Sequence, residues 1–368
     1  MTTPRVLHVV QSGDRGGVQR HVRDLAVGLA PRTAGVIVGS GGWLADALSG
    51  AGIRTDVVTS LRRSVNPTAV LLAGRDVAGA AASLGAGVVH AHGIFALLAA
   101  LSVRSLPIVY TAHGFQWRDP AHRPWLRALS RQLHRQITPR LAAFIAVSRQ
   151  DAEDATALGV DPRRIHRVPN GVEVPPLVEA ERRPRVLGTA GRLVPGKNVA
   201  GILELLAMLP TDVALWVAGE GHALARPPQA TTPPSLAHRV QWLGWRDDMD
   251  AFYRGIGVYV TMSRKEGMPY AVLDAMAYGC PTVASDIPAH RELLGGKPWG
   301  VLVPDGKLTA GVERVLSWLA DPQQHRQASA AARREVLQRF SLAAMLDLTA
   351  TVYHAAHTQA VATGSMTN

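Results

Sequence analysis

Short runs of β-branched residues alternate with helical patterns along the chain, and no other feature limits the possible folds as strongly. Residues 5–10 predict a buried strand, which a glycine-rich turn connects to an amphipathic segment at 18–29. Further strands are predicted at 36–38, 55–58, 88–90, 108–111 and 143–147, and helices at 67–84 and 125–137. Such alternation is typical of an α/β domain whose parallel sheet carries helices on both faces.

The alternation breaks once and then restarts. Residues 173–184 are rich in proline and charge and show no periodicity, so they predict a linker between two domains. Beyond the linker, strands are predicted at 186–189, 214–218, 239–243, 258–261 and 282–284, helices at 199–209 and 270–278, a proline-rich surface loop at 226–234, and a long alanine-rich helix at 342–360. A chain of 368 residues, 47% of them hydrophobic, has the size that suits two such domains.

The chain carries a formal net charge of +11, which indicates an anionic partner: a nucleic acid, an acidic membrane surface or a phosphorylated substrate. Most of this charge is arginine scattered along the chain, which a compositional bias would also produce. The single cysteine, Cys280, cannot form an internal disulfide, which fits a reducing compartment. The apolar stretch at 6–10 is too short for a signal peptide, and the run at 94–103 is too short to span a membrane. We therefore expect a cytoplasmic protein.

Two glycines, Gly16 and Gly17, separate the first predicted strand from the first predicted helix. Without a Cβ atom, backbone N–H groups at this point can approach a phosphate group closely. A tight turn without a ligand is the alternative. The segment lacks the G-x-G-x-x-G spacing and the following acidic residue of a dinucleotide site, so that kind of site is disfavoured.

Two cations, Arg192 and Lys197, lie in the loop after the first strand of the second domain. The carboxyl ends of strands are where open α/β sheets bind ligands. An arginine fork and a lysine point charge in one loop can neutralise a diphosphate. On charge alone, an exposed and solvated loop is the preferred explanation.

Two carboxylates, Glu266 and Asp274, follow a later strand with seven residues between them. Pro269 suits the first turn of a helix and Gly279 suits its end, so Glu266 would lie in a loop and Asp274 on the helix, on the walls of one pocket. The helix N-terminus would offer free N–H groups to a diphosphate. A general acid/base pair of a glycosidase is the alternative, but sequence spacing does not give the separation of the two carboxyl groups.

Three histidines, His90, His92 and His113, lie at the ends of predicted strands. A structural role and a metal site are both possible for such a group. The spacing lacks supporting carboxylates, so we expect no metal here.

Residues 117–140 carry repeated arginines beside an apolar stripe of Trp125, Leu129, Leu133 and Ile137. The stripe favours an ordinary helix that packs on the sheet. A basic amphipathic helix can also lie on an anionic membrane, and contact of the arginine face with a membrane stays open.

Four segments, taken together and in this order, resemble glycosyltransferase family four of the GT-B fold: 14–20 (DRGGVQR), 111–114 (TAHG), 191–198 (GRLVPGKN) and 263–276 (SRKEGMPYAVLDAM). The resemblance covers nearly the whole chain and implies two Rossmann-like, doubly wound domains facing a cleft. Residues 1–172 would bind the acceptor, with the helix at 342–360 crossing back to them, and residues 184–340 would bind the nucleotide sugar.

The resemblance also implies roles for individual residues. His113 would touch the transferred sugar, Glu266 the hydroxyls of the donor sugar and Asp274 the ribose hydroxyls, while Arg192 and Lys197 would hold the diphosphate. The catalytic set is then His113, Glu266, Arg192 and Lys197, and the donor-binding set is Gly16, Gly17, Arg192, Lys197, Glu266, Gly267, Met268, Pro269, Leu273 and Asp274. The family usually has Glu at the position of Asp274, which puts the tightness of ribose binding in doubt.

The activity implied by the resemblance is retaining transfer of a sugar from a nucleotide diphosphate sugar, without a metal or cofactor. UDP-sugars are preferred to GDP-sugars as donors, and the acceptor would be a glycan or a lipid-linked molecule of bacterial surface polysaccharide synthesis, with possible contact at the inner membrane face.

Two other functions stay in view. A sugar-nucleotide epimerase on a similar fold would turn over the donor alone. A basic nucleic-acid-binding protein is the alternative from another class, but zinc-finger spacing, an RNP-like aromatic motif and a basic tail are all missing from the sequence, so we expect no nucleic-acid partner.

Overall fold

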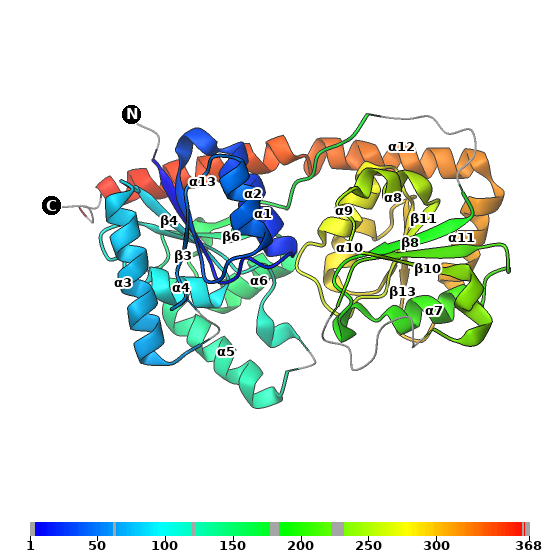
Figure 1. Ribbon diagram of the computed structural model, residues 1–368, viewed down its shortest axis with the longest axis horizontal. Helices are drawn as coiled ribbons and strands as arrows, with labels where there is room; N and C mark the ends of the chain where they lie inside the picture. Colours follow the sequence, from blue (N-terminus) through cyan, green and yellow to red (C-terminus); the bar gives the residue numbers. More distant parts are fainter. Residues whose placement is uncertain are drawn as a thin grey trace. The chain divides into compact units, whose positions relative to one another are not determined.

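The computed structural model describes residues 4–61, 64–119, 122–176, 184–221, 232–362 and 364. It divides into two compact units, residues 1–170 together with 342–368, and residues 171–341 (Figure 1). The predicted first domain ended at residue 172, but the N–H of Val172 donates to the Phe340 carbonyl at 2.9 Å, so the chain enters the second unit at Gly171. Most of the predicted linker (177–183) and of the predicted surface loop (226–231) lies outside the described residues.

The first unit is built on a seven-stranded sheet whose neighbouring strands are all parallel. Its strands are β1 (Val6–Val10), β2 (Thr33–Val38), β3 (Thr55–Val57), β4 (Val88–His92), β5 (Ile108–Thr111), β6 (Ala143–Ala146) and β7 (Ile165–Arg167), in the order β3-β2-β1-β4-β5-β6-β7. Its helices are α1 (Gly17–Gly28), α2 (Trp43–Gly50), α3 (Pro67–Ser83), α4 (Ile94–Ala100), α5 (Pro124–Ile137), α6 (Arg149–Ala157) and α13 (Leu342–Ala362).

The second unit repeats this plan with a six-stranded parallel sheet. Its strands are β8 (Val186–Ala190), β9 (Ala214–Ala218), β10 (Val240–Gly244), β11 (Val258–Thr261), β12 (Thr282–Ser285) and β13 (Gly300–Val303), in the order β10-β9-β8-β11-β12-β13. Its helices are α7 (Val199–Ala207), α8 (Met249–Gly255), α9 (Tyr270–Ala277), α10 (Pro288–Leu294), α11 (Thr309–Ala320) and α12 (Pro322–Arg339). Both units therefore have the doubly wound α/β fold that the alternation predicts.

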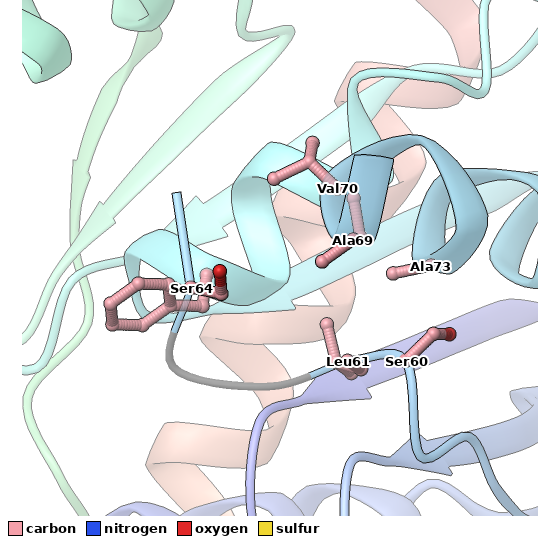
Figure 2. A pocket seen from close by; sticks show the side chains of 8 residues that line it. Ser60, Leu61, Ser64, Ala69, Val70 and Ala73 are labelled. Atoms are coloured by element: carbon pink, nitrogen blue, oxygen red, sulfur yellow. The ribbon is translucent and has the colours of Figure 1, made fainter. Parts of the chain in front are cut away.

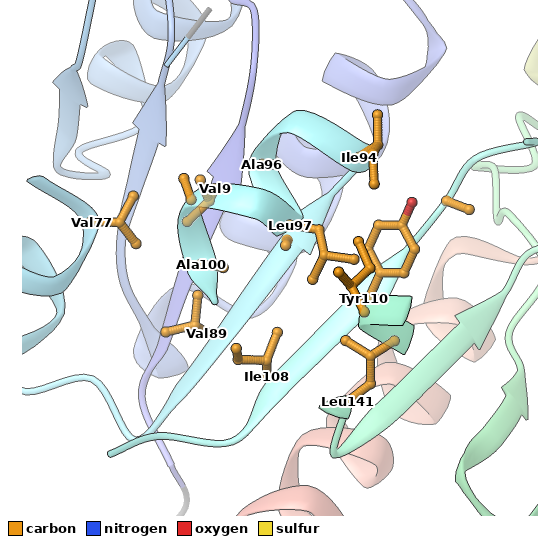
Figure 3. Packing of buried hydrophobic residues seen from close by; sticks show 14 of the residues in the cluster. Val9, Val77, Val89, Ile94, Ala96, Leu97, Ala100, Ile108, Tyr110 and Leu141 are labelled. Atoms are coloured by element: carbon orange, nitrogen blue, oxygen red, sulfur yellow. The ribbon is translucent and has the colours of Figure 1, made fainter. Parts of the chain in front are cut away.

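Helices cover both faces of the first sheet because successive residues of a buried strand point to opposite faces. On one face, Val9, Val89 and Ile108 pack with residues of α3 and α4, including Val77 and Leu97 (Figure 3). On the other face, β1 and β4 contribute Val6, Val10 and Val88, which pack with residues of α1, α2 and α13, including Leu25, Leu44 and Met345. The even-numbered His8, His90 and His92 belong to the face that α1 and α13 cover.

The last helix, α13, belongs to the first unit although it follows α12 of the second. Met345, Val352, Tyr353 and Ala356 are buried in the cluster that contains Val6 and Val88. Burying an aliphatic or aromatic side chain of this kind contributes roughly 1.5–3 kcal/mol. The helix is thus a structural part of the first core. Among the described residues, no helix is both long and apolar enough to cross a membrane.

Each sheet has one point at which the strand order reverses, because the strands that follow in sequence are added on the opposite side of the first strand. In the first sheet this point lies between β1 and β4, and in the second between β8 and β11. Ligands of open α/β sheets bind at the carboxyl ends of the strands beside such a point. The loops that follow β1, β4, β8 and β11 are therefore the places to look for a site.

Candidate functional site

In the second unit, the loop after β8 is held by a close approach of two backbone segments. The Leu193 N–H donates to the Glu220 carbonyl at 2.8 Å. A Cβ atom added at Gly219 would lie 1.9 Å from the Gly191 carbonyl oxygen, and one at Gly221 would lie 1.8 Å from that of Leu193. Only glycine fits at these two positions. This contact fixes the segment that carries Arg192 and Lys197.

Lys197 is brought to Glu266 across 69 positions of sequence. It closes a short 3-10 helix (Pro195–Lys197), after which Asn198 takes a left-handed conformation with φ of 49°. The Arg264 N–H donates to the Gly196 carbonyl at 2.9 Å, which joins the loop after β8 to the loop after β11. The Lys197 Nζ then lies 2.5 Å from Glu266 Oε1.

The environment of Glu266 keeps its carboxylate charged. Burial alone would raise the pKa of Glu266, but the charge and hydrogen bond of Lys197 hold that pKa below its usual value. Ser263, which is fully buried, and His290 act in the same direction. The pair is only partly exposed, with 31% of the Lys197 side chain and 15% of the Glu266 side chain accessible. A polar ligand can bind to such a pair, because the ammonium group donates hydrogen bonds and the carboxylate accepts them.

The remaining predicted donor residues of this unit lie at the start of α9. Met268, Pro269 and Leu273 are buried, and Gly267 and Asp274 are half-buried. The helix begins at Tyr270, as predicted, with Pro269 just before it, and Gly279 follows the helix with φ of 71°, as expected for its end. Glu266 and Asp274 both act electrostatically on the buried Tyr259, whose pKa burial raises, so the two carboxylates do share one neighbourhood.

Arg192 is the exception in this group. Its side chain is exposed, and among the described residues no hydrogen bond or ion pair of that side chain is found. The structure therefore brings Lys197 and Glu266 together and leaves Arg192 at the surface of the same loop.

His290 on α10 was not among the predicted site residues. The side chain is fully buried, and its Nδ1 lies 2.8 Å from the Ser285 carbonyl oxygen. Burial lowers the pKa of His290, while the charge of Glu266 opposes that shift. The sequence signal was present but weak: His290 follows the end of β12, the strand next to β11.

In the first unit, Gly16 and Gly17 lie at the start of α1, after the turn that follows β1. The helix begins at Gly17, and Gly16 precedes it in an extended conformation. A Cβ atom at Gly16 would meet only the flexible Gln19 side chain, at 2.7 Å, so the protein itself does not require glycine there. Gly13, which was not a predicted site residue, is the position where a Cβ atom would clash with backbone, 2.5 Å from the Ser40 carbonyl oxygen.

His113 follows β5 in a left-handed conformation with φ of 56°, and Gly114 continues it with φ of 86°. This conformation costs a residue with a Cβ atom roughly 1–2 kcal/mol, so the surrounding structure must hold it in place. The His113 ring is 4.7 Å, between ring centroids, from that of His21 on α1. The predicted sugar-contacting histidine and the helix that begins at Gly17 are thus neighbours.

We call His8, His21, His90, His92 and His113 the imidazole cluster. The nearest nitrogens of His8, His90 and His92 lie within 4.8 Å of one another, and so do those of His21, His92 and His113. Either trio has the residue types for a transition metal. The expectation of no metal stays a prediction.

A small cavity in the first unit lies apart from the predicted residues. It is lined by Ser60, Leu61, Ser64, Ala69, Val70, Ala73, Phe95 and Ala99, and Figure 2 shows Leu61 opposite Ala69 and Ala73 of α3. Its volume of about 10 Å³ leaves room for one water at most. The cavity is too small for a sugar.

Helix α5 corrects the expectation that its apolar stripe packs on the sheet. Leu133 and Ile137 do pack against the core, but Trp125 is 59% exposed and Leu129 is 56% exposed. The stripe winds around the helix, so only its C-terminal half reaches the sheet. The Arg127 Nε donates to the Trp117 carbonyl at 2.6 Å.

Comparison with known families assigns both halves of the chain. The family model of glycosyltransferase family 4 matches residues 15–174, and that of the group 1 glycosyl transferases matches residues 178–335. Together they cover more than four fifths of the chain. The chain belongs to glycosyltransferase family four.

Two curated family members illustrate the range of relatives. The chain is 27% identical over 241 residues to the UDP-Gal:alpha-D-GlcNAc-diphosphoundecaprenol alpha-1,3-galactosyltransferase of Escherichia coli, a match that covers 59% of this chain and 62% of that protein. It is 26% identical over 282 residues to the lipopolysaccharide core biosynthesis mannosyltransferase LpsB of Rhizobium meliloti, covering 72% of this chain and 78% of LpsB. The match thus spans less than two thirds of the length of the first relative.

Among solved structures, Anabaena Alr3699/HepE in complex with UDP-glucose superposes with a TM-score of 0.79 at 20% identity, covering 95% of this chain and 99% of HepE. The likeness establishes the GT-B fold. These comparisons support neither the epimerase nor the nucleic-acid-binding alternative.

Proposed function

We propose that this chain is a retaining glycosyltransferase that moves a sugar from a nucleotide diphosphate sugar to a hydroxyl group of a glycan or lipid-linked acceptor. The observation that carries the proposal is the Lys197–Glu266 pair. It lies beyond the carboxyl ends of β8 and β11, where the strand order of the second sheet reverses. The second unit would hold the nucleotide sugar and the first unit the acceptor.

The pair and its loop offer one group for each part of a donor. The Lys197 ammonium and the exposed Arg192 guanidinium would neutralise the diphosphate, and backbone N–H groups at the start of α9 would donate to its oxygens. The Glu266 carboxylate would accept hydrogen bonds from sugar hydroxyls, and Asp274 from the ribose. His113, with Gly16 and Gly17, would contribute from the first unit.

In the proposed reaction, the bond between the anomeric carbon and the diphosphate oxygen breaks, and the acceptor oxygen bonds to the same face of that carbon. The acceptor proton passes to the departing phosphate oxygen, so atoms and charge balance. Cations that are already in place stabilise the charge that grows on the leaving group, which is usually the largest catalytic contribution. We propose that Lys197 and Arg192 take this role without a metal ion or cofactor.

We propose a UDP-sugar as the donor. The Escherichia coli relative is named for UDP-galactose, and the HepE structure holds UDP-glucose. Because those names describe other proteins, the donor must be tested directly. The acceptor would belong to bacterial surface polysaccharide or glycoconjugate synthesis, the field of the named relatives.

Thermal denaturation of the purified protein with UDP-, GDP- and ADP-sugars tests this proposal. A ligand that binds the native state at a hundred times its dissociation constant stabilises it by about 2.7 kcal/mol. We expect UDP-sugars to raise the melting temperature and ADP-sugars to leave it unchanged. An unchanged melting temperature with every nucleotide sugar would overturn the proposal, and conversion of the donor without an acceptor would favour an epimerase.

A second feature, helix α5, supports contact with an anionic membrane at the cytoplasmic face. Trp125, Leu126 and Leu129 are exposed on one part of the helix. Between Asp119 and Asp151 the chain has six arginines and no acidic residue. Exposed aromatic and aliphatic side chains beside arginines are the combination that anionic lipid surfaces attract.

Vesicle sedimentation tests this contact. Wild-type protein should sediment with anionic vesicles at low salt, sediment less with neutral vesicles, and be released as salt rises. The variant Trp125→Ser/Leu129→Ser should lose binding. A matched control is Leu71→Ser/Leu72→Ser on α3, where two leucines are exposed to a similar degree. Equal losses in both double variants, or equal binding to both vesicle types, would contradict the proposal.

A further inference from the structure

The imidazole cluster contains a chain of three rings that ends at His113. The Nδ1 of His8 lies 3.2 Å from the Nε2 of His92, and the Nδ1 of His92 lies 3.1 Å from the Nε2 of His113. His8 and His92 are buried on neighbouring strands, and His113 is partly exposed. One hydrogen bond therefore connects each ring to the next, from the middle of the sheet to the predicted sugar-contacting residue.

Every ring of this chain is neutral near pH 7. Burial lowers the pKa of His8 to about 3 and also lowers the pKa values of His92 and His113. A neutral imidazole has one N–H donor and one acceptor nitrogen. The protons of the three rings must therefore all point the same way along the chain, either toward His113 or away from it.

The far end of the chain decides between the two directions. The Nε2 of His8 is buried and has no hydrogen-bond partner among the described residues. If the protons point away from His113, this nitrogen carries an N–H group without a partner. If they point toward His113, it is only an acceptor without a partner. Buried N–H groups without a partner are the rarer and costlier of the two, so the protons point toward His113.

The two other histidines of the cluster do not disturb this order, because both have partners outside it. The ring nitrogens of His90 lie 2.7 Å from the Tyr353 hydroxyl and 2.8 Å from the Thr111 hydroxyl. The Nδ1 of His21 lies 3.1 Å from the Asn170 Oδ1. Hydroxyl groups can donate or accept, so they adapt to either tautomer of His90.

We propose that His92 and His8 are positioning residues that fix His113 in the tautomer with its proton on Nδ1. His113 then accepts a hydrogen bond from His92 through Nε2 and offers an N–H donor at Nδ1. Such a donor selects an oxygen lone pair, and under the proposed function that oxygen belongs to a hydroxyl group of the transferred sugar. The left-handed backbone at His113 and the hydrogen bond from His92 together fix the direction of that donor.

Two substitutions of His92 separate its two hydrogen bonds. The amide of an asparagine overlaps the Nδ1 side of an imidazole, and that of a glutamine overlaps the Nε2 side. His92→Asn can still donate to His113, whereas His92→Gln keeps the contact with His8 and loses the one with His113. We expect turnover to fall about tenfold in His92→Gln, the loss of one hydrogen bond, and to stay within about threefold of wild type in His92→Asn.

NMR of the ring nitrogens with ¹⁵N-labelled histidine reads the tautomer without any substrate, so its result stands even if the proposed transferase activity fails. We expect His113 protonated on Nδ1 in the wild type and in His92→Asn, and a mixture of tautomers in His92→Gln. If His92→Gln does not fold, His8→Leu provides the same readout from the far end of the chain, compared with His8→Asn.

Two results would overturn the proposal. One is His113 protonated on Nε2 in the wild type. The other is about one equivalent of zinc or another transition metal in the purified protein, because the metal would then occupy the lone pairs of the trios described above and set the tautomers itself.

Discussion

The two units share one topology and place opposite chemistry at the same point of it. Where the strand order of the first sheet reverses, the structure has buried histidines, and burial lowers their pKa values. Where the strand order of the second sheet reverses, it has a partly exposed ion pair, Lys197 and Glu266. The fold thus fixes only the location of a site. The residues that follow each strand decide whether that location suits a neutral hydroxyl group or a charged phosphate.

Acidification should affect the two units unequally, and this is the largest effect we expect. The pKa of His8 is lowered to about 3 and that of His21 to about 4, from an ordinary value of 6.5. The stability that comes from keeping them neutral is present above pH 6.5 and is lost as pH falls toward these values. Between pH 6.5 and its lowered pKa, each such histidine reduces the free energy of unfolding by roughly 1.4 kcal/mol per pH unit.

Hydrogen exchange followed by mass spectrometry at pH 7.5 and pH 5.5, corrected for the intrinsic exchange rates, measures this for each unit. Protection in β1 and β4 should decrease more than protection in β8 and β11. The pKa of Glu266 is lowered below its ordinary value near 4.5, so the stability that Glu266 contributes is lost only at lower pH. Equal loss of protection in both sheets would remove the contrast between the units.

Removal of the Lys197 charge is the next largest effect. Lys197→Ala should reduce kcat about a hundredfold, the typical loss of one preorganised donor at a growing negative charge. Steady-state kinetics, with the nucleotide sugar that raises the melting temperature as the donor, measures it. Lys307→Ala, which removes an exposed lysine of the same unit, is the control and should be near normal. Similar kcat values for both variants would mean that the ion pair has a structural role only.

The variant Asp274→Asn tests the second unit with a smaller expected effect than Lys197→Ala. The amide keeps the shape of the side chain but removes its charge and replaces one acceptor oxygen by a donor, so the two ribose hydroxyls no longer have an acceptor oxygen each. Nucleotide affinity should fall by about 1.5–3 kcal/mol, measured by calorimetry with the nucleotide diphosphate. Asp305→Asn, an exposed carboxylate of the same unit, should bind normally. Unchanged affinity in Asp274→Asn would remove Asp274 from the ribose site.

The smallest expected effect is that of a chelator. If the cations of the second unit neutralise the leaving group and the histidines of the first unit bind only one another, EDTA should change neither turnover nor the melting temperature. Activity that EDTA abolishes and that Mg²⁺ or Mn²⁺ restores would contradict the metal-independent mechanism. A melting temperature that EDTA lowers would instead indicate a metal in the imidazole cluster.

The sequence was sufficient for the elements whose pattern is local. The alternation predicted eleven of the thirteen strands, and Gly279 marked the end of α9. It did not predict β7 and β13, which are among the shortest strands: β7 has a histidine and an arginine in three residues, and β13 has only three apolar residues after a glycine. The exposed half of the α5 stripe was also misjudged, because helical periodicity does not say which turns of a helix reach the sheet.

Contacts between distant segments were harder to predict. Lys197 and Glu266 were each assigned to a donor site, but their ion pair joins two loops that also share the Arg264–Gly196 hydrogen bond, and no sequence pattern encodes these contacts. His8 could have been added to the histidines at the strand ends, because the register of β1 on β4 places it beside His90. His290 had only its position after β12 as a signal.

The membership of α13 in the first unit has a consequence for biosynthesis. A ribosome releases the chain from its N-terminus, and domains generally fold as they emerge. Residues 171–341 are continuous, so the second unit can fold as soon as they are available. The first unit emerges earlier but must wait for Met345, Val352 and Tyr353 before its core is closed. The part of this protein that is made first is therefore the part that is finished last, and until then the apolar residues that α13 covers stay uncovered.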